Sequence, residues 1–351
     1  MEFKVSTTQL GLTFAGCFLG AGYVSGKELW RFFGQYGTWG WLGLLASLLG
    51  LGFFGVLVLR LALHTEKINL SELIIPWEVP VLRSAVSVFS TMLLFCVVVI
   101  MTAGVGAAFN QLFHLPAWLC SMAFSLLVAI LALAGLSGML SLFSFVVPTL
   151  ILATTVFSTI ALIYLPQNPP LDYTDHGWFS SAVIFCGYNV FSSIAILAPL
   201  SRAVPPSHRS RGIFLGCGLL FVIAVPILLA LRHCGTQAQA ELPMLAIASR
   251  IWGGFGWIYA GLLLMAMLTT ALSCFLTGIN GLMAARPFLA PHKTVCLFLA
   301  VSCTWLASLL GFGNLINLVY PLFGIISFLC LACLVLHDRR KARSQSSMES
   351  V

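Results

Sequence analysis

The residues best suited to bind a solute begin at Gly20-Ala-Gly-Tyr-Val-Ser-Gly26, which interrupts an apolar stretch of the chain. Glycines permit a helix to unwind, and backbone N–H and C=O groups freed inside a membrane are tolerated only where protein buries them or they line a cavity. Such groups can bind a solute. The alternative is that the glycines form close packing faces between helices. We expect substrate contacts from Gly20, Gly22, Ser25, Gly26 and Glu28.

Three charged residues, Lys27, Glu28 and Arg31, follow this segment. Ionisable groups within a membrane span are costly and are candidates for functional sites. On an intact helix, Glu28 can pair with Lys27 or Arg31. Two interpretations stay open: a structural salt bridge at the outer mouth, or an extracellular gate in which Glu28 also contacts substrate.

A second interruption, Phe185-Cys-Gly-Tyr-Asn189, occupies the matching place in the other half of the chain. Gly187 provides a hinge, Tyr188 a phenol and Asn189 an amide. Glycine-interrupted hydrophobic segments at corresponding positions of two halves indicate broken helices around a midplane substrate site. The alternative is that these polar groups form hydrogen bonds between helices and have a structural role.

A third polar cluster, Thr269, Thr270 and Ser273, lies within an apolar stretch. Thr269 and Ser273 share one face of a helix, and small neutral oxygens are ligands for a hard cation. The alternative is that each hydroxyl bonds back to its own helix.

The composition excludes a soluble domain and a nucleic-acid partner. Of the 351 residues, 60% are hydrophobic and 8% are charged, which is typical of a membrane protein. The net charge of +7 is dispersed in connections and a tail, not massed on one face. The eleven cysteines are scattered, so we interpret them as packing residues.

Apolar runs between polar breaks predict ten membrane-spanning helices. The first five cover residues 8–164 and the last five 177–336, so a relation between the two sets is an inverted repeat within a single transporter domain, 1–336. The predicted spans are roughly 8–35, 39–61, 80–109, 115–134, 139–164, 177–200, 211–231, 255–284, 292–311 and 313–336.

The distribution of basic residues predicts the orientation. Thirteen of the seventeen Lys and Arg fall on the side of the termini, so both termini are expected in the cytoplasm. The segment 236–252 is too short to span a membrane, so we expect it to form an outer helix lying over the bundle. The polar, basic tail, 337–351, predicts disorder near anionic lipid headgroups.

The run from Gly20 to Gly37 resembles the first-span signature of the YkvI-like bacterial membrane proteins, which are similar to the amino acid–polyamine–organocation superfamily. The resemblance implies an all-α LeuT-type fold, with ten helices in a five-plus-five inverted repeat and with broken first and sixth helices. It implies a substrate between the breaks, near Gly187, Tyr188 and Asn189.

The same resemblance implies a sodium site. Its ligands by position are carbonyls of Ala21 and Val24 and hydroxyls of Thr269, Thr270 and Ser273. Some relatives use a lysine of the fifth span in place of sodium, but residues 139–164 contain none.

We therefore expect a secondary transporter in the cytoplasmic membrane that carries a small amino acid or related zwitterion with sodium, and that needs no other cofactor. A nutrient receptor of the same fold is the alternative. An enzyme is disfavoured because the seven His lie singly, in or near connections.

Overall fold

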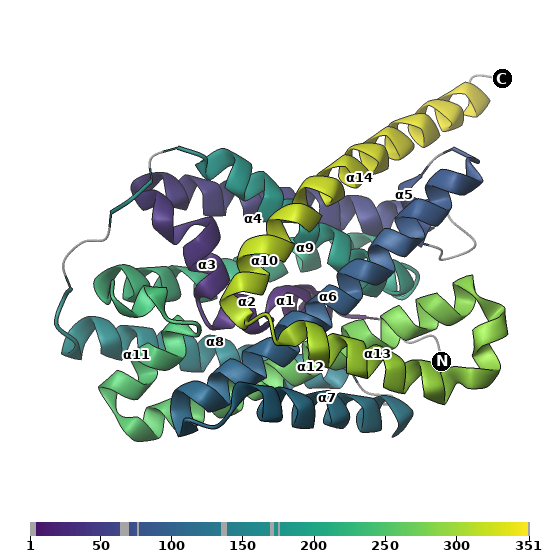
Figure 1. Ribbon diagram of the computed structural model, residues 1–351. Coiled ribbons are helices and arrows are strands. Elements are labelled where there is room, and N and C mark those ends of the chain that lie inside the picture. Colours follow the sequence, from purple (N-terminus) through teal and green to yellow (C-terminus); the bar gives the residue numbers. More distant parts are fainter. Residues whose placement is uncertain are drawn as a thin grey trace.

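The computed structural model describes residues 5–63, 70–75, 77–134, 139–168, 172–174 and 176–349, and every regular element in these ranges is a helix (Figure 1). Lys4 and Lys67, which contributed to the charge bias, lie outside them.

The helices match the predicted spans. The interrupted first span comprises α1 (Thr7–Phe18), α2 (Ala21–Val24) and α3 (Lys27–Phe32). The remaining nine are α4 (Gly37–Leu63), α6 (Pro80–Phe113), α7 (Ala117–Ala134), α8 (Met139–Tyr164), α9 (Trp178–Leu200), α10 (Pro206–His233), α12 (Gly253–Ala285), α13 (Lys293–Ser308) and α14 (Phe312–Glu349). The short elements are η1 (Gly34–Tyr36), α5 (Leu70–Ile74), η2 (Gln237–Gln239), α11 (Pro243–Ile251) and η3 (Pro287–His292).

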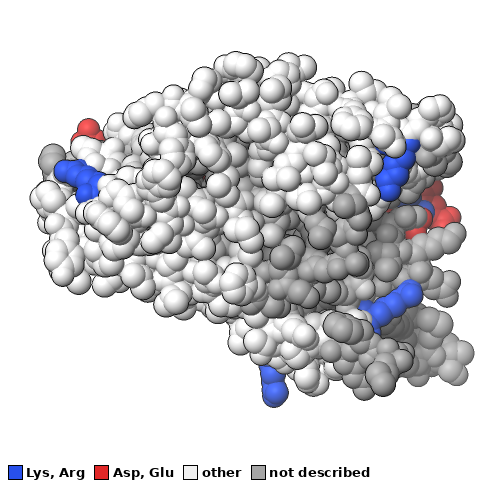
Figure 2. All heavy atoms as spheres, turned by 90° about the horizontal axis from the view of Figure 1, so that it is seen from below, with Lys and Arg blue, Asp and Glu red and all other residues white. Residues whose placement is uncertain are grey.

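The long helices are apolar enough to cross a membrane. In the described residues, six meet the length and composition of a span, and three more are apolar but shorter. Figure 2 shows one face of the molecule on which charged side chains are few and lie at its periphery. Such a surface suits a bilayer, and the chain is a multi-pass membrane protein.

The packing repeats when the chain is shifted by five spans. The first span, α1, packs against the seventh, α10, and the fifth, α8. Its counterpart, the sixth span α9, packs against the second, α4, and the tenth, α14. The third and eighth spans, α6 and α12, pack against each other. Exchange of the two halves leaves this pattern unchanged, as a five-plus-five inverted repeat requires.

The first span is broken, but the sixth is not. Gly20 has extended backbone between α1 and α2, whereas α9 continues through Gly187 without interruption. The prediction of a break there is wrong for a physical reason. A Cβ on Gly187 would lie 2.6 Å from the carbonyl oxygen of Gly324 in α14, so this glycine permits close helix packing and leaves the helix intact.

Two expectations for the connections had different outcomes. The expected outer helix is α11, with Met244, Leu245 and Ile247 buried. The tail, expected to be disordered from residue 337, instead continues α14 as far as Glu349. Residues 337–349 contain no Gly or Pro, and Arg, Lys, Ala and Gln favour helix, so nothing local ends it.

Candidate functional site

The break after α1 removes helical partners from two carbonyl groups. The amide of Gly20 donates to the carbonyl of Phe18 at 2.8 Å, and the amide of Ala21 donates to Sδ of Met101 at 3.3 Å. In a continuous helix these amides would donate to the carbonyls of Gly16 and Cys17. In the described chain no backbone amide replaces them, so these two carbonyls are free to accept from a ligand.

A second turn, at Gly26, directs α3. Gly26 has φ +81°, which favours glycine, and a Cβ there would lie 2.9–3.2 Å from Leu231, Ile227 and Met244. The turn starts α3 at Lys27. Because adjacent residues on a helix point about 100° apart, Lys27 and Glu28 diverge.

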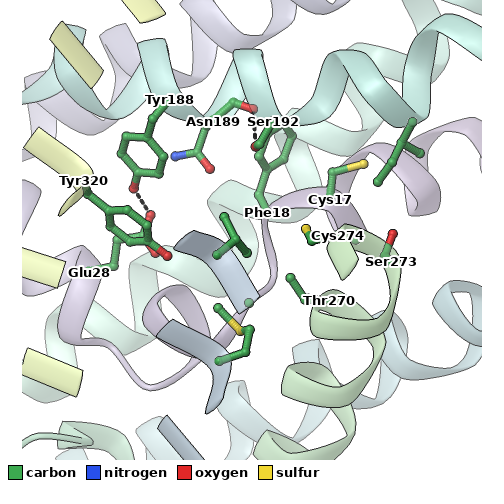
Figure 3. Close-up of a pocket in the computed structure, with 15 residues that line it drawn as sticks. Cys17, Phe18, Glu28, Tyr188, Asn189, Ser192, Thr270, Ser273, Cys274 and Tyr320 are labelled. Carbon is green, nitrogen blue, oxygen red and sulfur yellow. Dashed lines mark hydrogen bonds between the residues drawn. The ribbon is translucent and has the colours of Figure 1, made fainter. Parts of the chain in front are cut away.

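Glu28 points into the protein (Figure 3). Its side chain is buried, and the hydroxyl of Tyr188 donates to Oε1. Oε2 lies only 2.5 Å from the position that a Cβ on Gly22 would take, so the absence of a side chain at Gly22 makes room for the carboxyl. Tyr320 stacks on Tyr188, with ring centroids 4.4 Å apart.

In the described chain neither neighbouring basic residue pairs with Glu28, so of the two interpretations the local salt bridge is wrong. Lys27 Nζ donates instead to the carbonyls of Gln239 at 3.2 Å and Ala240 at 2.8 Å. Nε of Arg31 is buried without a hydrogen-bond partner in the described chain. A buried carboxylate that no cation compensates is costly, so Glu28 favours binding of a positive charge.

The carboxyl lies beside a cavity of about 40 Å³, enough for a few water molecules. The cavity is lined by residues of α1, α3, α6, α9, α12 and α14 and by Gly20, and no Lys, Arg or His lines it in the described chain. Its lining residues are Gly16, Cys17, Phe18, Gly20, Glu28, Val97, Met101, Tyr188, Asn189, Ser192, Ile196, Thr270, Ser273, Cys274 and Tyr320.

The predicted ion ligands divide into two groups. Thr270 and Ser273 line the cavity, opposite the end of α1 (Figure 3). Thr269 does not line it, because its hydroxyl donates back to the carbonyls of Met265 and Ala266. The other two predicted ligands, Ala21 and Val24, also lie outside the lining, and their carbonyls already have donors. The carbonyl of Ala21 accepts from the amide of Ser25, and that of Val24 accepts from the hydroxyl of Tyr259 at 2.7 Å.

The predicted substrate residues are also divided. Gly20, Glu28, Tyr188 and Asn189 meet at the cavity. The remaining four do not line it. Gly22 makes room for Glu28, and Gly187 packs on α14. Gly26 forms the turn before α3, and the Ser25 hydroxyl bonds within that turn.

Sequence reasoning missed the contributions of α6 and α14. The sulfur of Met101, in α6, accepts a hydrogen bond from the amide of Ala21, and the ring of Tyr320, in α14, stacks on that of Tyr188. A signal existed for one of them: Tyr320 precedes Pro321 within an apolar span, and a proline inside a helix frees a backbone carbonyl. Nothing in the sequence marks Met101.

Two bacterial proteins are similar to this chain over nearly its whole length. The uncharacterized membrane protein YkvI of Bacillus subtilis (strain 168) is 25% identical over 351 residues, covering 98% of this chain and 99% of that protein. The uncharacterized protein YyaD of the same organism is 25% identical over 333 residues, covering 93% and 95%. No family model matches the chain.

Solved transporters share the fold. A manganese transporter of Eremococcus coleocola superimposes with a TM-score of 0.60 at 13% identity, covering 93% of this chain and 78% of that one. Mhp1, a nucleobase-cation-symport-1 family transporter with bromovinylhydantoin bound, gives 0.58 at 12% identity, covering 95% and 76%. The resemblance to the YkvI-like proteins and the LeuT-type fold are therefore confirmed.

Proposed function

We propose that this chain is a secondary transporter that carries a small solute with a positively charged nitrogen, an amino acid or related zwitterion, by alternating access with sodium as the coupling ion. The observation that carries the proposal is the carboxyl of Glu28, which is buried beside a cavity at a break in the first span. A break at such a cavity is the arrangement in which this class of fold binds its substrate.

The charge of the cavity defines which end of the solute binds at the break. The amides of Gly20, Ala21, Val24, Ser25 and Gly26 already have protein acceptors, and the carboxyl of Glu28 lies against Gly22. A carboxylate of the solute would meet a like charge there. We therefore assign the ammonium group to Glu28, and a neighbouring polar group of the solute to the amide of Asn189.

The coupling ion is assigned to the opposite wall of the cavity. Thr270 and Ser273 line the cavity together with Gly16 and Cys17, whose carbonyls have lost their amide partners at the end of α1. Neutral oxygens of this kind suit a hard monovalent cation. This assignment replaces the carbonyls of Ala21 and Val24, in α2, with those of Gly16 and Cys17, at the end of α1.

Manganese is not proposed as cargo despite the likeness to a manganese transporter. In the described residues, no three His, Cys, Asp or Glu side chains gather where they could hold a metal ion. One carboxylate with neutral neighbours suits an ammonium group better than a divalent transition metal.

A ligand screen on Glu28→Gln tests the solute assignment. Thermal shifts of the purified protein, with amino acids and simple amines and with or without sodium, identify the ligand. Glu28→Gln should then weaken its binding about 10- to 100-fold, the size of effect expected for losing a hydrogen bond to a charged group. Glu78→Gln changes an exposed carboxyl and serves as the matched control. Unchanged affinity in Glu28→Gln would refute the assignment. Binding without uptake into proteoliposomes would favour a receptor.

Reporter fusions test the proposed orientation. With both termini in the cytoplasm, as the bias of Lys and Arg favours, fusions after Tyr173 and after Arg343 should report opposite sides of the membrane. The same side for both would exclude it.

A further inference from the structure

The Lys27 ammonium group connects α3 to the segment between α10 and α12. It donates to the carbonyls of Gln239 and Ala240, at the end of η2, and its side chain is half-buried. Carbonyls at a helix end are partially negative and bind cations. The contact therefore holds two distant parts of the chain together through charge-assisted hydrogen bonds.

A second connection joins the same two parts of the chain close to Lys27. The amide of Met244, in the first turn of α11, donates to the carbonyl of Ser25 at 2.8 Å. The Met244 side chain also packs on Gly26, together with Ile227 and Leu231 of α10. Residues 239–244 thus fasten the turn that starts α3 on two sides.

Glu241 completes the surroundings of Lys27. A Cβ on Gly313 would lie 3.7 Å from Lys27 Cε and 4.0 Å from Glu241 Oε1, which brings the first turn of α14 to the same place. The carboxylate favours the charged ammonium group. Three segments that are remote in sequence therefore meet at one lysine.

We propose that Lys27 is a positioning residue that fastens segment 237–251 to α3 and so keeps Glu28 in the cavity. Lys27 and Glu28 are consecutive in one short helix, so their backbones move together. When segment 237–251 separates from Lys27, α3 is released and the carboxyl of Glu28 leaves its place against Gly22. The inference rests on the proposed function in that Glu28 is taken as the solute ligand.

Two native cysteines provide a readout that needs no solute. Cys17 and Cys274 line the cavity, whereas Cys303 is exposed on α13. In the purified protein, modification of each thiol by a small methanethiosulfonate reagent can be followed by mass spectrometry. In Lys27→Met, Cys274 should react about tenfold faster than in the parent protein, as expected from losing charge-assisted hydrogen bonds. Cys303 should react at an unchanged rate.

Conservative variants separate this role from general destabilisation. Lys27→Arg keeps donors for both carbonyls and should react like the parent, while Lys27→Gln should fall between Arg and Met. Lys293→Met removes an exposed lysine and is the matched control. Parent-like protection of Cys274 in folded Lys27→Met would overturn the proposal. If that variant does not fold, equal rates in Lys27→Gln and Lys27→Arg would overturn it too. Loss of ligand binding in Glu28→Gln alone bears on the proposed function and leaves this measurement intact.

Discussion

The first and sixth spans hold equivalent positions in the repeat, yet they use glycine differently. In the first span, Gly20 is extended and Gly26 is left-handed, so the helix is interrupted twice. In the sixth span, Gly187 stays helical and brings α9 close to the backbone of α14. A glycine in an apolar span thus indicates that its backbone lies close to another part of the protein, either a side chain of the site or another helix. The identity of that neighbour decides whether the glycine serves the site or the scaffold.

The largest effect on the site is expected for Gly22→Val. A Cβ there would lie 2.5 Å from Glu28 Oε2 and 3.1 Å from Glu28 Cβ, so a branched side chain displaces the carboxyl. Ligand binding should weaken about 100-fold or more, because the charged contact is lost and Tyr188 loses its acceptor. Gly218→Val is the control, since a Cβ on Gly218 meets nothing within 4 Å. A Gly22→Val protein that folds and binds normally would place the site elsewhere.

The complementary effect, on stability, is expected for Gly187→Ala. The new methyl group would meet the carbonyl oxygen of Gly324 at 2.6 Å, and backbone cannot move aside as a side-chain end can. We expect a loss of about 1–3 kcal/mol in the free energy of unfolding, typical of overpacking, measured as a lower melting temperature than that of Gly218→Ala. Ligand affinity of the folded protein should change little. Equal stability of the two variants would show that close packing does not explain Gly187.

A smaller effect should separate Thr270 from its neighbour Thr269. Thr270 lines the cavity, whereas the hydroxyl of Thr269 already donates to two carbonyls of its own helix. Thr270→Ala should raise the sodium concentration for half-maximal ligand binding about tenfold, as expected for a perturbed ion site, while Thr269→Ala should change it much less. Ligand binding that responds to pH and not to sodium would rule out the ion assignment.

The smallest effect is expected for Tyr259→Phe. The Tyr259 hydroxyl donates to the carbonyl of Val24 at 2.7 Å and thereby holds the second half of the break against α12. Its removal should cost roughly 1 kcal/mol in the free energy of unfolding, the net contribution of a buried hydrogen bond. The variant's melting temperature checks this. A value equal to that of the parent protein would mean that Val24 finds another donor.

The spans and the first break were predictable because each depends on local sequence. Apolar runs determine where helices cross the membrane, and α11 could be recognised because its segment is too short to span. The break required only clustered glycines beside charged residues. These signals lie within one or two helical turns.

The remainder depended on contacts between distant segments. Gly187 resembles a hinge until Gly324, more than a hundred residues later, is found against it. Glu28 lies between two basic residues in the sequence, but Lys27 binds segment 237–251 and Glu28 turns to Tyr188. Glu28 could be identified as a site residue from sequence, but its partner could not, since it comes from the other half of the repeat.

The length of α14 gives the cavity a mechanical connection to the far end of the molecule. Tyr320 lies in the cavity wall, and Pro321 beside it removes one hydrogen bond from the helix, which makes this a bending point. From Pro321 to Glu349 the helix extends about 43 Å and projects well beyond its neighbours (Figure 1). A tilt of about five degrees at Pro321 therefore moves the end of α14 by about 4 Å. A tilt of α14 beside Tyr320 would therefore be measured best with a label near Glu349, where the displacement is largest.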